Sequence, residues 1–343
     1  MAATSNIEWT DRTWNPTVGC DKVSPGCRGC YAEVMGKRLR AMALADLEAG
    51  RNPGRKAAYI EAVDARGRWT GKVPTLPDAL GDPLKWRKPA RVFVNSMSDL
   101  FHDAVPFEFI AAVFGVMAAC PQHTFQVLTK RPERAVEFFA WAQGNNHSHP
   151  ETTCLHYSRA YTAAPANGVY RWPLPNVHLG VSVENQETAD DRIPPLLQCP
   201  AAVHFVSYEP ALGPVDFAPY LRPNWDVFVG PCGCSERRDP WTRCDNCIHT
   251  LRWVIVGGES GPNARPFDVA WARSTVAQCR EAGVACFVKQ LGARPEFNGA
   301  MGFVSESWKL KDKAGADPSE WPEDLREQEF PNGNIGARVG GQE

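Results

Sequence analysis

The feature that most constrains this chain is a short loop carrying three cysteines, Cys20, Cys27 and Cys30, at the spacing Cys-x6-Cys-x2-Cys. Prolines and glycines surround them, and a segment with helical spacing of apolar residues follows directly, at 32–42. Such a loop can wrap three thiolates around a metal. Three thiolates on a four-iron cluster leave one iron open to a small molecule, whereas a structural zinc site normally closes with a fourth ligand. We therefore expect an open iron–sulfur site on this loop.

Half of a zinc knuckle and part of a disulfide framework are the alternatives for the same three cysteines. Seven of the 12 cysteines fall into two tight clusters at metal-ligand spacing, and a reducing cytosol keeps such thiols available for metal. The chain has no apolar run of membrane-span length and does not start with a basic and then an apolar segment. We expect a cytoplasmic protein with no membrane partner. The formal net charge of -2 gives no overall attraction to nucleic acid, so such a partner would need a local basic patch.

The second cysteine cluster consists of Cys232, Cys234, Cys244 and Cys247, on a polar hairpin inserted before an apolar segment that starts at Arg252. Four thiolates suit tetrahedral zinc. An insertion this short has no hydrophobic core of its own, so a bound metal would supply its fold. We expect a structural Zn²⁺ site over residues 231–249, with a second iron–sulfur cluster as the alternative.

A repeat of short apolar strands and helical segments predicts the fold. The strands are expected at 91–95, 124–128, 177–183, 202–207, 252–256 and 285–289, with one more before Cys20, and the helices between them at 106–119, 132–142, 187–197 and 269–282. Nearly continuous apolar strands that alternate with helices indicate parallel β/α units buried on both faces. Seven such units predict an α/β protein with an open or partial β/α barrel, formed by residues 1–343 as one domain.

Two segments fall outside this repeat. Residues 143–173 are polar and contain His147, His149, Cys154 and His156 at irregular spacing, which favours a solvated insertion over a metal site. Residues 292–343 are rich in glycine and charge, and we expect an irregular C-terminal segment that packs across the barrel, anchored by Trp308, Trp321 and Pro322.

The predicted strands from 91–95 onward each end in polar or charged residues. They are Asn95-Ser96, Thr129-Lys130-Arg131, Ser182, Glu184-Asn185, Ser207, Glu209, Glu259-Ser260 and Lys289-Gln290. In parallel barrels the loops after the strands converge on one mouth, and the active site lies there. The repetition predicts one composite site, although a cap or a turn is the more common role for any single member.

The residues around the cysteines resemble the radical S-adenosylmethionine enzymes, and within them an uncharacterised phage and bacterial group. The resemblance is carried by 7–11, 13–16 and the nearly unbroken run 19–33, and it continues through 95–102, 128–132, 180–185 and 257–261. It therefore covers most of the chain. Two features depart from the wider superfamily, whose usual loop is Cys-x3-Cys-x2-Cys and whose Gly-Gly-Glu strand end comes early, whereas Gly257-Gly258-Glu259 comes late here.

The resemblance implies a partial β/α barrel of the radical S-adenosylmethionine type, with a [4Fe–4S] cluster on Cys20, Cys27 and Cys30. S-adenosylmethionine would chelate the open iron and be cleaved reductively, giving a 5′-deoxyadenosyl radical that abstracts a substrate hydrogen. A reductase or flavodoxin-type protein would donate the electron. The implied cofactor-binding residues are Ser96, Asp99, Ser182, Glu184, Asn185, Glu209 and Glu259.

Four cations are candidates for binding an anionic substrate, and each could equally be a salt-bridged surface group. They are Lys130, Arg131, Arg265 and Lys289. Lys130-Arg131 and the Cys30-Tyr31-Ala32 run resemble the DNA-repair radical lyases such as spore photoproduct lyase, which favours a nucleotide or nucleic-acid substrate over a peptide or small metabolite. A different class of function stays open, in which both cysteine clusters hold zinc and the barrel is a non-catalytic nucleic-acid- or protein-binding adaptor.

Overall fold

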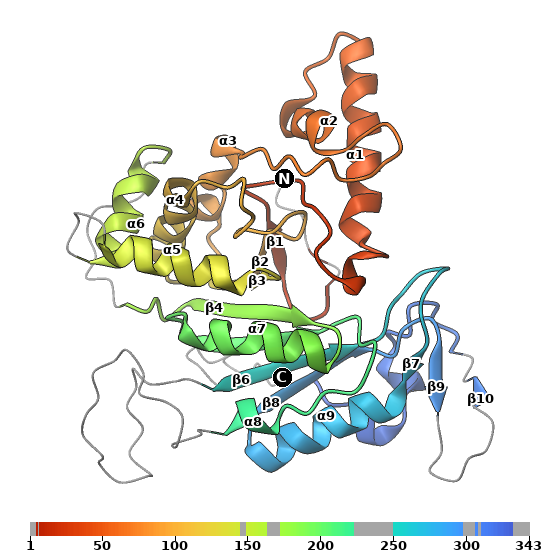
Figure 1. The fold of residues 1–343 in the computed structure, drawn as a ribbon. Helices are drawn as coiled ribbons and strands as arrows, with labels where there is room; N and C mark the ends of the chain where they lie inside the picture. The colour runs from red at the N-terminus through yellow and green to blue at the C-terminus, as the bar shows by residue number, and fades with distance from the viewer. Residues whose placement is uncertain are drawn as a thin grey trace, which may run out of the picture.

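The structure is a computed structural model that describes residues 5, 7–144, 149–162, 172–222, 250–297, 306–307 and 310–331. Seven parallel strands form one sheet in the order β1-β2-β3-β4-β5-β6-β8. The sheet curls into a half-barrel, and α7 and α9 run across its front in Figure 1. The predicted α/β fold with a partial β/α barrel is therefore confirmed.

The strands of the large sheet are β1 (Arg12–Trp14), β2 (Arg91–Val94), β3 (Thr124–Thr129), β4 (Val177–Val183), β5 (Val203–Tyr208), β6 (Leu251–Gly257) and β8 (Ala285–Gln290). A small second sheet joins β7 (Phe267–Asp268), β9 (Pro295–Phe297) and β10 (Glu306–Ser307). The helices are α1 (Tyr31–Glu48), α2 (Ala58–Ala62), α3 (Pro77–Leu80), α4 (Phe107–Ala118), α5 (Pro132–Gly144), α6 (Pro150–Arg159), α7 (Gln186–Gln198), α8 (Ala218–Leu221) and α9 (Val269–Ala282). Every strand expected from the sequence forms, and the one before Cys20 is β1, which ends at Trp14.

The strands alternate between two apolar faces. Val92 and Val94 of β2 belong to the large core beneath the helices, whereas Phe93 between them faces the inside of the half-barrel. There it meets Trp9, Phe205 and Trp253 in a cluster of aromatic rings whose centroids lie 4.8–6.4 Å apart. Trp9 of the N-terminal segment thus fills the inside of the half-barrel, because the curled sheet leaves room there for large rings.

Further along the strands, the inward side chains become polar. Ser182 of β4 pairs in register with Ser207 of β5. This pair lies two residues beyond the pair Gly180 and Phe205, on the same face of the sheet. Both serines are buried. The inner face of the half-barrel therefore carries aromatic rings, together with the buried Gln126 and His178, toward the amino ends of the strands and serines toward their carboxyl ends, which is where a parallel barrel builds its site.

The polar stretch at 143–173 is not solvated throughout, which corrects the expectation of a solvated insertion. Residues 150–159 form α6, which packs against α4 and buries Cys154 and Leu155. The approach is close because α4 has Gly115 at the contact, where a Cβ atom would lie less than 3.0 Å from the Cys154 carbonyl oxygen. His147 lies outside the described residues.

The C-terminal segment crosses the far edge of the sheet. Trp321 and Leu325 are buried, and the chain then runs beside β8, where the Val288 N–H donates to the Glu327 carbonyl at 2.8 Å and the Glu329 N–H donates to the Cys286 carbonyl at 2.8 Å. Because these bonds pair an edge strand, they cover backbone groups that would otherwise be open. Trp308 lies outside the described residues.

A membrane crossing would need a long apolar helix, and none occurs in the part of the chain that the structure describes.

The contact between α4 and α6 can be tested with one methyl group. Gly115→Ala should lower the free energy of unfolding by about 1–3 kcal/mol, because the added Cβ overlaps a backbone carbonyl that cannot move independently. Gly144→Ala, in α5, is the matched control, since a Cβ atom there meets nothing within 4 Å and the change raises helix propensity. Thermal unfolding midpoints measure both. Equal midpoints for the two variants would contradict the close packing of α4 on α6.

Candidate functional site

The cysteine loop lies at the carboxyl ends of the parallel strands. Gly19 forms an isolated parallel bridge with Ser98, beyond the end of β2, and its N–H donates to the Met97 carbonyl at 3.1 Å. A single 3-10 turn, Pro25–Cys27, follows. Cys30 is then the N-cap of α1, so the first N–H groups of that helix, which have no partner within the helix, point toward the loop.

Two glycines let the loop settle onto carboxylates from the sheet. A Cβ atom on Gly26 would lie less than 3.0 Å from Oε1 of Glu184, which follows β4. A Cβ atom on Gly29 would lie equally close to Oε1 of Glu259, which follows β6. The structure thus brings two of the predicted cofactor-binding residues directly against the cysteine loop, and a side chain at either glycine would displace the carboxylate or the loop.

Glu184 is a fully buried carboxylate with three partners. It forms ion pairs with Lys130 and with Arg192, the latter at 3.1 Å, and it accepts a hydrogen bond from the Ser24 hydroxyl at 2.8 Å. Burial alone would raise the pKa of Glu184, but the charges of Lys130 and Arg192 outweigh burial and lower it. Ser24 belongs to the cysteine loop, so this carboxylate joins the loop to β3, β4 and α7.

Asp99 is the second buried carboxylate of the site. It accepts hydrogen bonds from the Thr129 hydroxyl at 2.7 Å and from the Lys130 N–H at 2.9 Å, and it pairs with Arg131 at 3.2 Å. Arg131 also pairs with Asp21, which is next to Cys20 in the loop. Asp99 is therefore occupied by protein donors on the neighbouring strand end.

Glu259 and Glu209 each pair with a predicted substrate-binding cation. Arg265 donates to both carboxylate oxygens of Glu259, at 2.8 and 2.9 Å, and also to the Pro25 carbonyl of the loop at 2.9 Å. These hydrogen bonds lower the pKa of Glu259, against an opposing effect of burial. Lys289 pairs with Glu209 at 2.5 Å.

The four predicted cations thus neutralise the four predicted carboxylates. The pairs are Lys130 with Glu184, Arg131 with Asp99, Arg265 with Glu259, and Lys289 with Glu209. All four cations are therefore salt-bridged, and their part in binding a substrate stays a prediction. Three of these pairs tie the cysteine loop to the strand ends, and the fourth, Lys289 with Glu209, joins the carboxyl ends of β5 and β8.

The remaining predicted residues have structural partners as well. Asn185 is the N-cap of α7, where its side-chain oxygen accepts the Thr188 N–H at 3.0 Å, so this oxygen is used in capping. The Ser96 hydroxyl donates to Asn15 at 3.2 Å. Ser182 is buried, and its carbonyl accepts a hydrogen bond from Arg192 at 2.6 Å.

The three loop cysteines carry free thiols in unlike surroundings. Burial and the nearby Asp99 raise the pKa of the Cys20 thiol to about 12, although Arg131 opposes them. Burial also disfavours ionisation of Cys27, but the Lys130 charge and hydrogen bonds from Val23 and Ser24 outweigh it, so the pKa of the Cys27 thiol is lowered. Among the described residues, no group of three or more His, Cys, Asp or Glu side chains lies close enough together to hold a metal ion.

The second cysteine cluster, Cys232, Cys234, Cys244 and Cys247, lies outside the described residues, so the zinc site stays a prediction.

A cavity of about 600 Å³ lies beside the cysteine loop. Its lining residues are Arg28, Gly29, Glu259, Pro262, Asn263, Ala264, Arg265 and Arg294. Arg28 and Arg294 were missed by the sequence analysis, and the only signal for Arg28 was its place between Cys27 and Cys30.

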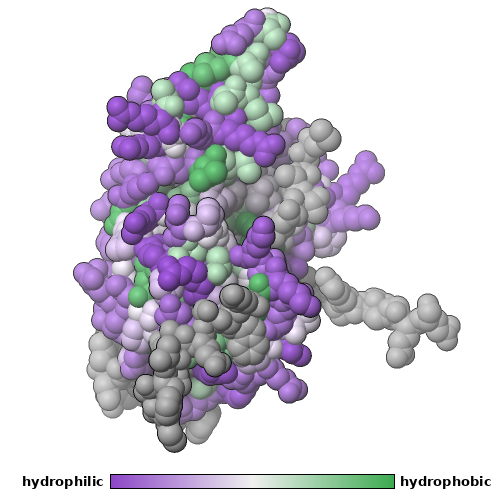
Figure 2. All heavy atoms as spheres, turned by 90° about the vertical axis from the view of Figure 1, so that its right-hand side faces the viewer, coloured by the Kyte–Doolittle hydropathy of each residue, from purple (hydrophilic) through white to green (hydrophobic). Residues whose placement is uncertain are grey.

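Apolar side chains are exposed along the neighbouring α1, as Figure 2 shows at the top of the face that it presents; they are Tyr31, Val34, Met35, Met42 and Leu47.

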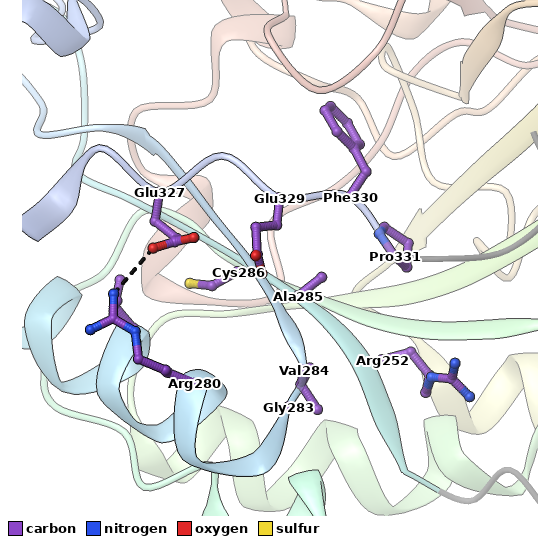
Figure 3. A pocket seen from close by; sticks show the side chains of 11 residues that line it. Arg252, Arg280, Gly283, Val284, Ala285, Cys286, Glu327, Glu329, Phe330 and Pro331 are labelled. Carbon is purple, nitrogen blue, oxygen red and sulfur yellow. Dashed lines mark hydrogen bonds and ion pairs between the residues drawn. The ribbon is translucent and has the colours of Figure 1, made fainter. Parts of the chain in front are cut away.

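Another cavity, of about 540 Å³, lies at the amino ends of β6 and β8, away from the cysteine loop (Figure 3). Arg280 and Glu327 pair across one side of it at 3.2 Å, and Cys286 lies between them and Glu329. None of the predicted site residues lines this cavity, so we place the functional site at the cysteine loop.

The fold and this site define the class of the protein: a parallel β/α half-barrel with a cysteine-bearing loop on the carboxyl ends of its strands. Residues 4–323 match the model of the family described as protein of unknown function DUF5131, and the chain belongs to that family. Comparisons with curated proteins and with solved structures gave no match.

Glu184 should be the residue on which the integrity of the site most depends. Glu184→Gln keeps the shape of the side chain but leaves Lys130 and Arg192 charged and uncompensated, which should lower the free energy of unfolding by about 3–5 kcal/mol at neutral pH. Glu187→Gln is the matched control, because Glu187 is an exposed carboxylate in the first turn of the same helix. Thermal or urea unfolding measures the difference.

The same variant gives a pH test with a defined sign. The pKa of Glu184 is lower in the folded protein than its ordinary value of 4.5, so its contribution is full above pH 4.5 and is lost as the pH falls through the folded pKa. Unfolding curves of the native chain and of Glu184→Gln should therefore converge as the medium is acidified below that value. A stability difference that stays constant into strong acid would contradict the ionised, paired state of Glu184.

Proposed function

We propose that this protein is a radical S-adenosylmethionine enzyme in which Cys20, Cys27 and Cys30 hold a [4Fe–4S] cluster at the mouth of the half-barrel. The observation that carries the proposal is the position of the cysteine loop. The loop that carries the three free thiols packs against Glu184, which follows β4, and Glu259, which follows β6. Both contacts are at the carboxyl ends of the parallel strands. Loops at these strand ends form the active sites of parallel β/α barrels.

The donor set fits an iron–sulfur cluster, since three thiols supply three cluster ligands and leave one iron open. Cys27 is the loop thiol best prepared for binding, because its pKa is lowered. Cys20, with its raised pKa, would have to release a proton as it binds. Loading also requires the loop to draw its sulfur atoms together, since the described residues hold no preformed metal-binding group.

When bound, the cluster would supply the electron for reductive cleavage of S-adenosylmethionine and so start hydrogen abstraction from the substrate. The chain's own residues position the loop for this. Glu184 accepts a hydrogen bond from the Ser24 hydroxyl, and Arg265 donates one to the Pro25 carbonyl, so two neighbouring loop residues are bound to the strand ends. Lys130 lies near Cys27 and Arg131 near Cys20, where positive charge favours thiolate over thiol.

A nucleotide or nucleic-acid substrate and a reductase or flavodoxin-type electron donor complete the proposal, together with a structural zinc ion on the second cysteine cluster. Because the four strand-end cations are neutralised by carboxylates, a phosphate-bearing substrate would need other cations at the site.

Metal content and cofactor cleavage test the proposal. After anaerobic reconstitution we expect a brown protein with about four irons and about one zinc per chain, which releases 5′-deoxyadenosine when dithionite and S-adenosylmethionine are added. Cys27→Ala should lose the iron and the release but keep the zinc. Cys120→Ala, which removes a buried thiol after α4, is the control and should keep all three.

A colourless protein with zinc alone and no release of 5′-deoxyadenosine would overturn the enzyme proposal and leave the zinc-stabilised adaptor as the function. Iron that survives Cys27→Ala at the native level would instead show that the loop is not the cluster site.

A further inference from the structure

Two arginines at the site form no salt bridge with the described residues, although Arg28 lies near enough to Glu259 for its charge to lower the pKa of that carboxyl. The guanidinium groups of Arg28 and Arg294 make no hydrogen bond or ion pair with any residue that the structure describes, and both side chains are exposed on the cavity beside the cysteine loop. Lys130, Arg131, Arg265 and Lys289 all differ from them in being paired with carboxylates.

The charge of this cavity is positive in consequence. Glu259 is the single acidic residue of its lining, and Arg265 takes up that charge through both carboxylate oxygens. The lining therefore has three positive charges, on Arg28, Arg265 and Arg294, against the one negative charge of Glu259, and keeps a surplus of positive charge. A guanidinium group presents several N–H donors in one plane, which suits the oxygens of a phosphate better than those of a neutral ligand.

The size of the cavity fits the same ligand. Its volume of about 600 Å³ lies in the range of pockets that bind molecules of nucleotide size. The lining next to the cysteine loop consists of Arg28 and Gly29, so a molecule bound in the cavity lies beside the loop.

We propose that Arg28 and Arg294 bind a phosphate group of the substrate, so that the substrate is a nucleotide, either free or within a nucleic-acid strand. This inference rests on the proposed function, because the bound nucleotide is a substrate only if the cluster forms at the loop. Arg28 lies between two of the cluster cysteines and would hold the phosphate beside the reacting centre. The phosphate is common to both sources of the nucleotide, and the binding experiment separates them.

The experiment measures binding to the reconstituted full chain, with and without S-adenosylmethionine. The probes are the four nucleoside 5′-monophosphates, the matching nucleosides without phosphate, and a fluorescent single-stranded 12-nucleotide oligonucleotide. We expect at least one phosphate-bearing probe to bind about tenfold or more tightly than its phosphate-free counterpart or, for the strand, with an affinity that falls steeply with salt. Monophosphate binding identifies a free nucleotide, and binding of the strand alone identifies a nucleic acid.

Variants link the binding to the two arginines. Arg28→Gln and Arg294→Gln should each weaken binding of that probe about tenfold or more, because each removes charge-assisted hydrogen bonds. Arg87→Gln is the control, since Arg87 is exposed before β2 and does not line the cavity. Thermal midpoints equal to that of the native chain exclude unfolding as the cause of a loss, and two separate arginines make the test independent of either variant alone.

Three results would overturn the inference: no binding of any phosphate-bearing probe under either condition, unchanged binding in both arginine variants, or displacement of the probe by S-adenosylhomocysteine, which would assign the arginines to the cofactor. The outcome is distinct from that of the proposed function. A chain that cleaves S-adenosylmethionine but binds no phosphate loses only this inference, whereas a chain that binds phosphate through both arginines without holding iron loses only the radical chemistry.

Discussion

The burial of Glu184 is the constraint on which the rest of the site depends. A carboxylate can be removed from water at the end of a parallel strand only if cations and hydrogen-bond donors replace the water. Here Lys130 comes from the end of β3, Arg192 from α7 and the Ser24 hydroxyl from the cysteine loop. One buried charge therefore fixes two neighbouring β/α units relative to each other and holds the loop that carries the thiols onto both.

The same physical solution recurs around the mouth. Asp99 with Arg131, and Glu259 with Arg265, also join a strand end to the cysteine loop, through Asp21 and the Pro25 carbonyl respectively. Arg131 and Glu259 were predicted because they follow apolar strands, Asp99 because the resemblance implies it, and Arg265 as a candidate cation, whereas Asp21 was not predicted. The sequence analysis did not find their pairing, because which strand ends lie side by side depends on the curl of the sheet and on side-chain reach, and both are absent from spacing along the chain.

The fold itself was open to prediction because strands buried on both faces are apolar throughout their length, so β4 and α9 were placed with the bounds that they have. Helix α6 was missed for the converse reason. Its composition is polar, and its burial comes from packing along α4, with a close approach at Gly115, and against α5 rather than from an apolar stripe of its own. Asn185 shows a third case, in which a polar residue after a strand serves as a helix cap.

The cations at the carboxyl ends of the strands differ in whether a carboxylate pairs with them, and this difference indicates which of them can bind a ligand. A cation that is buried beside a carboxylate has its position fixed by that partner and has little capacity left for a ligand, as for Lys130. A cation on a cavity wall that makes no hydrogen bond or ion pair within the described residues keeps its donors for a ligand, as for Arg28 and Arg294. Because an exposed guanidinium pays no desolvation cost while the cavity is empty, it can remain unpaired in the folded chain. An incoming anion then forms its hydrogen bonds without first breaking an ion pair, which is the physical reason to look for the substrate at these two arginines and not at the four paired cations.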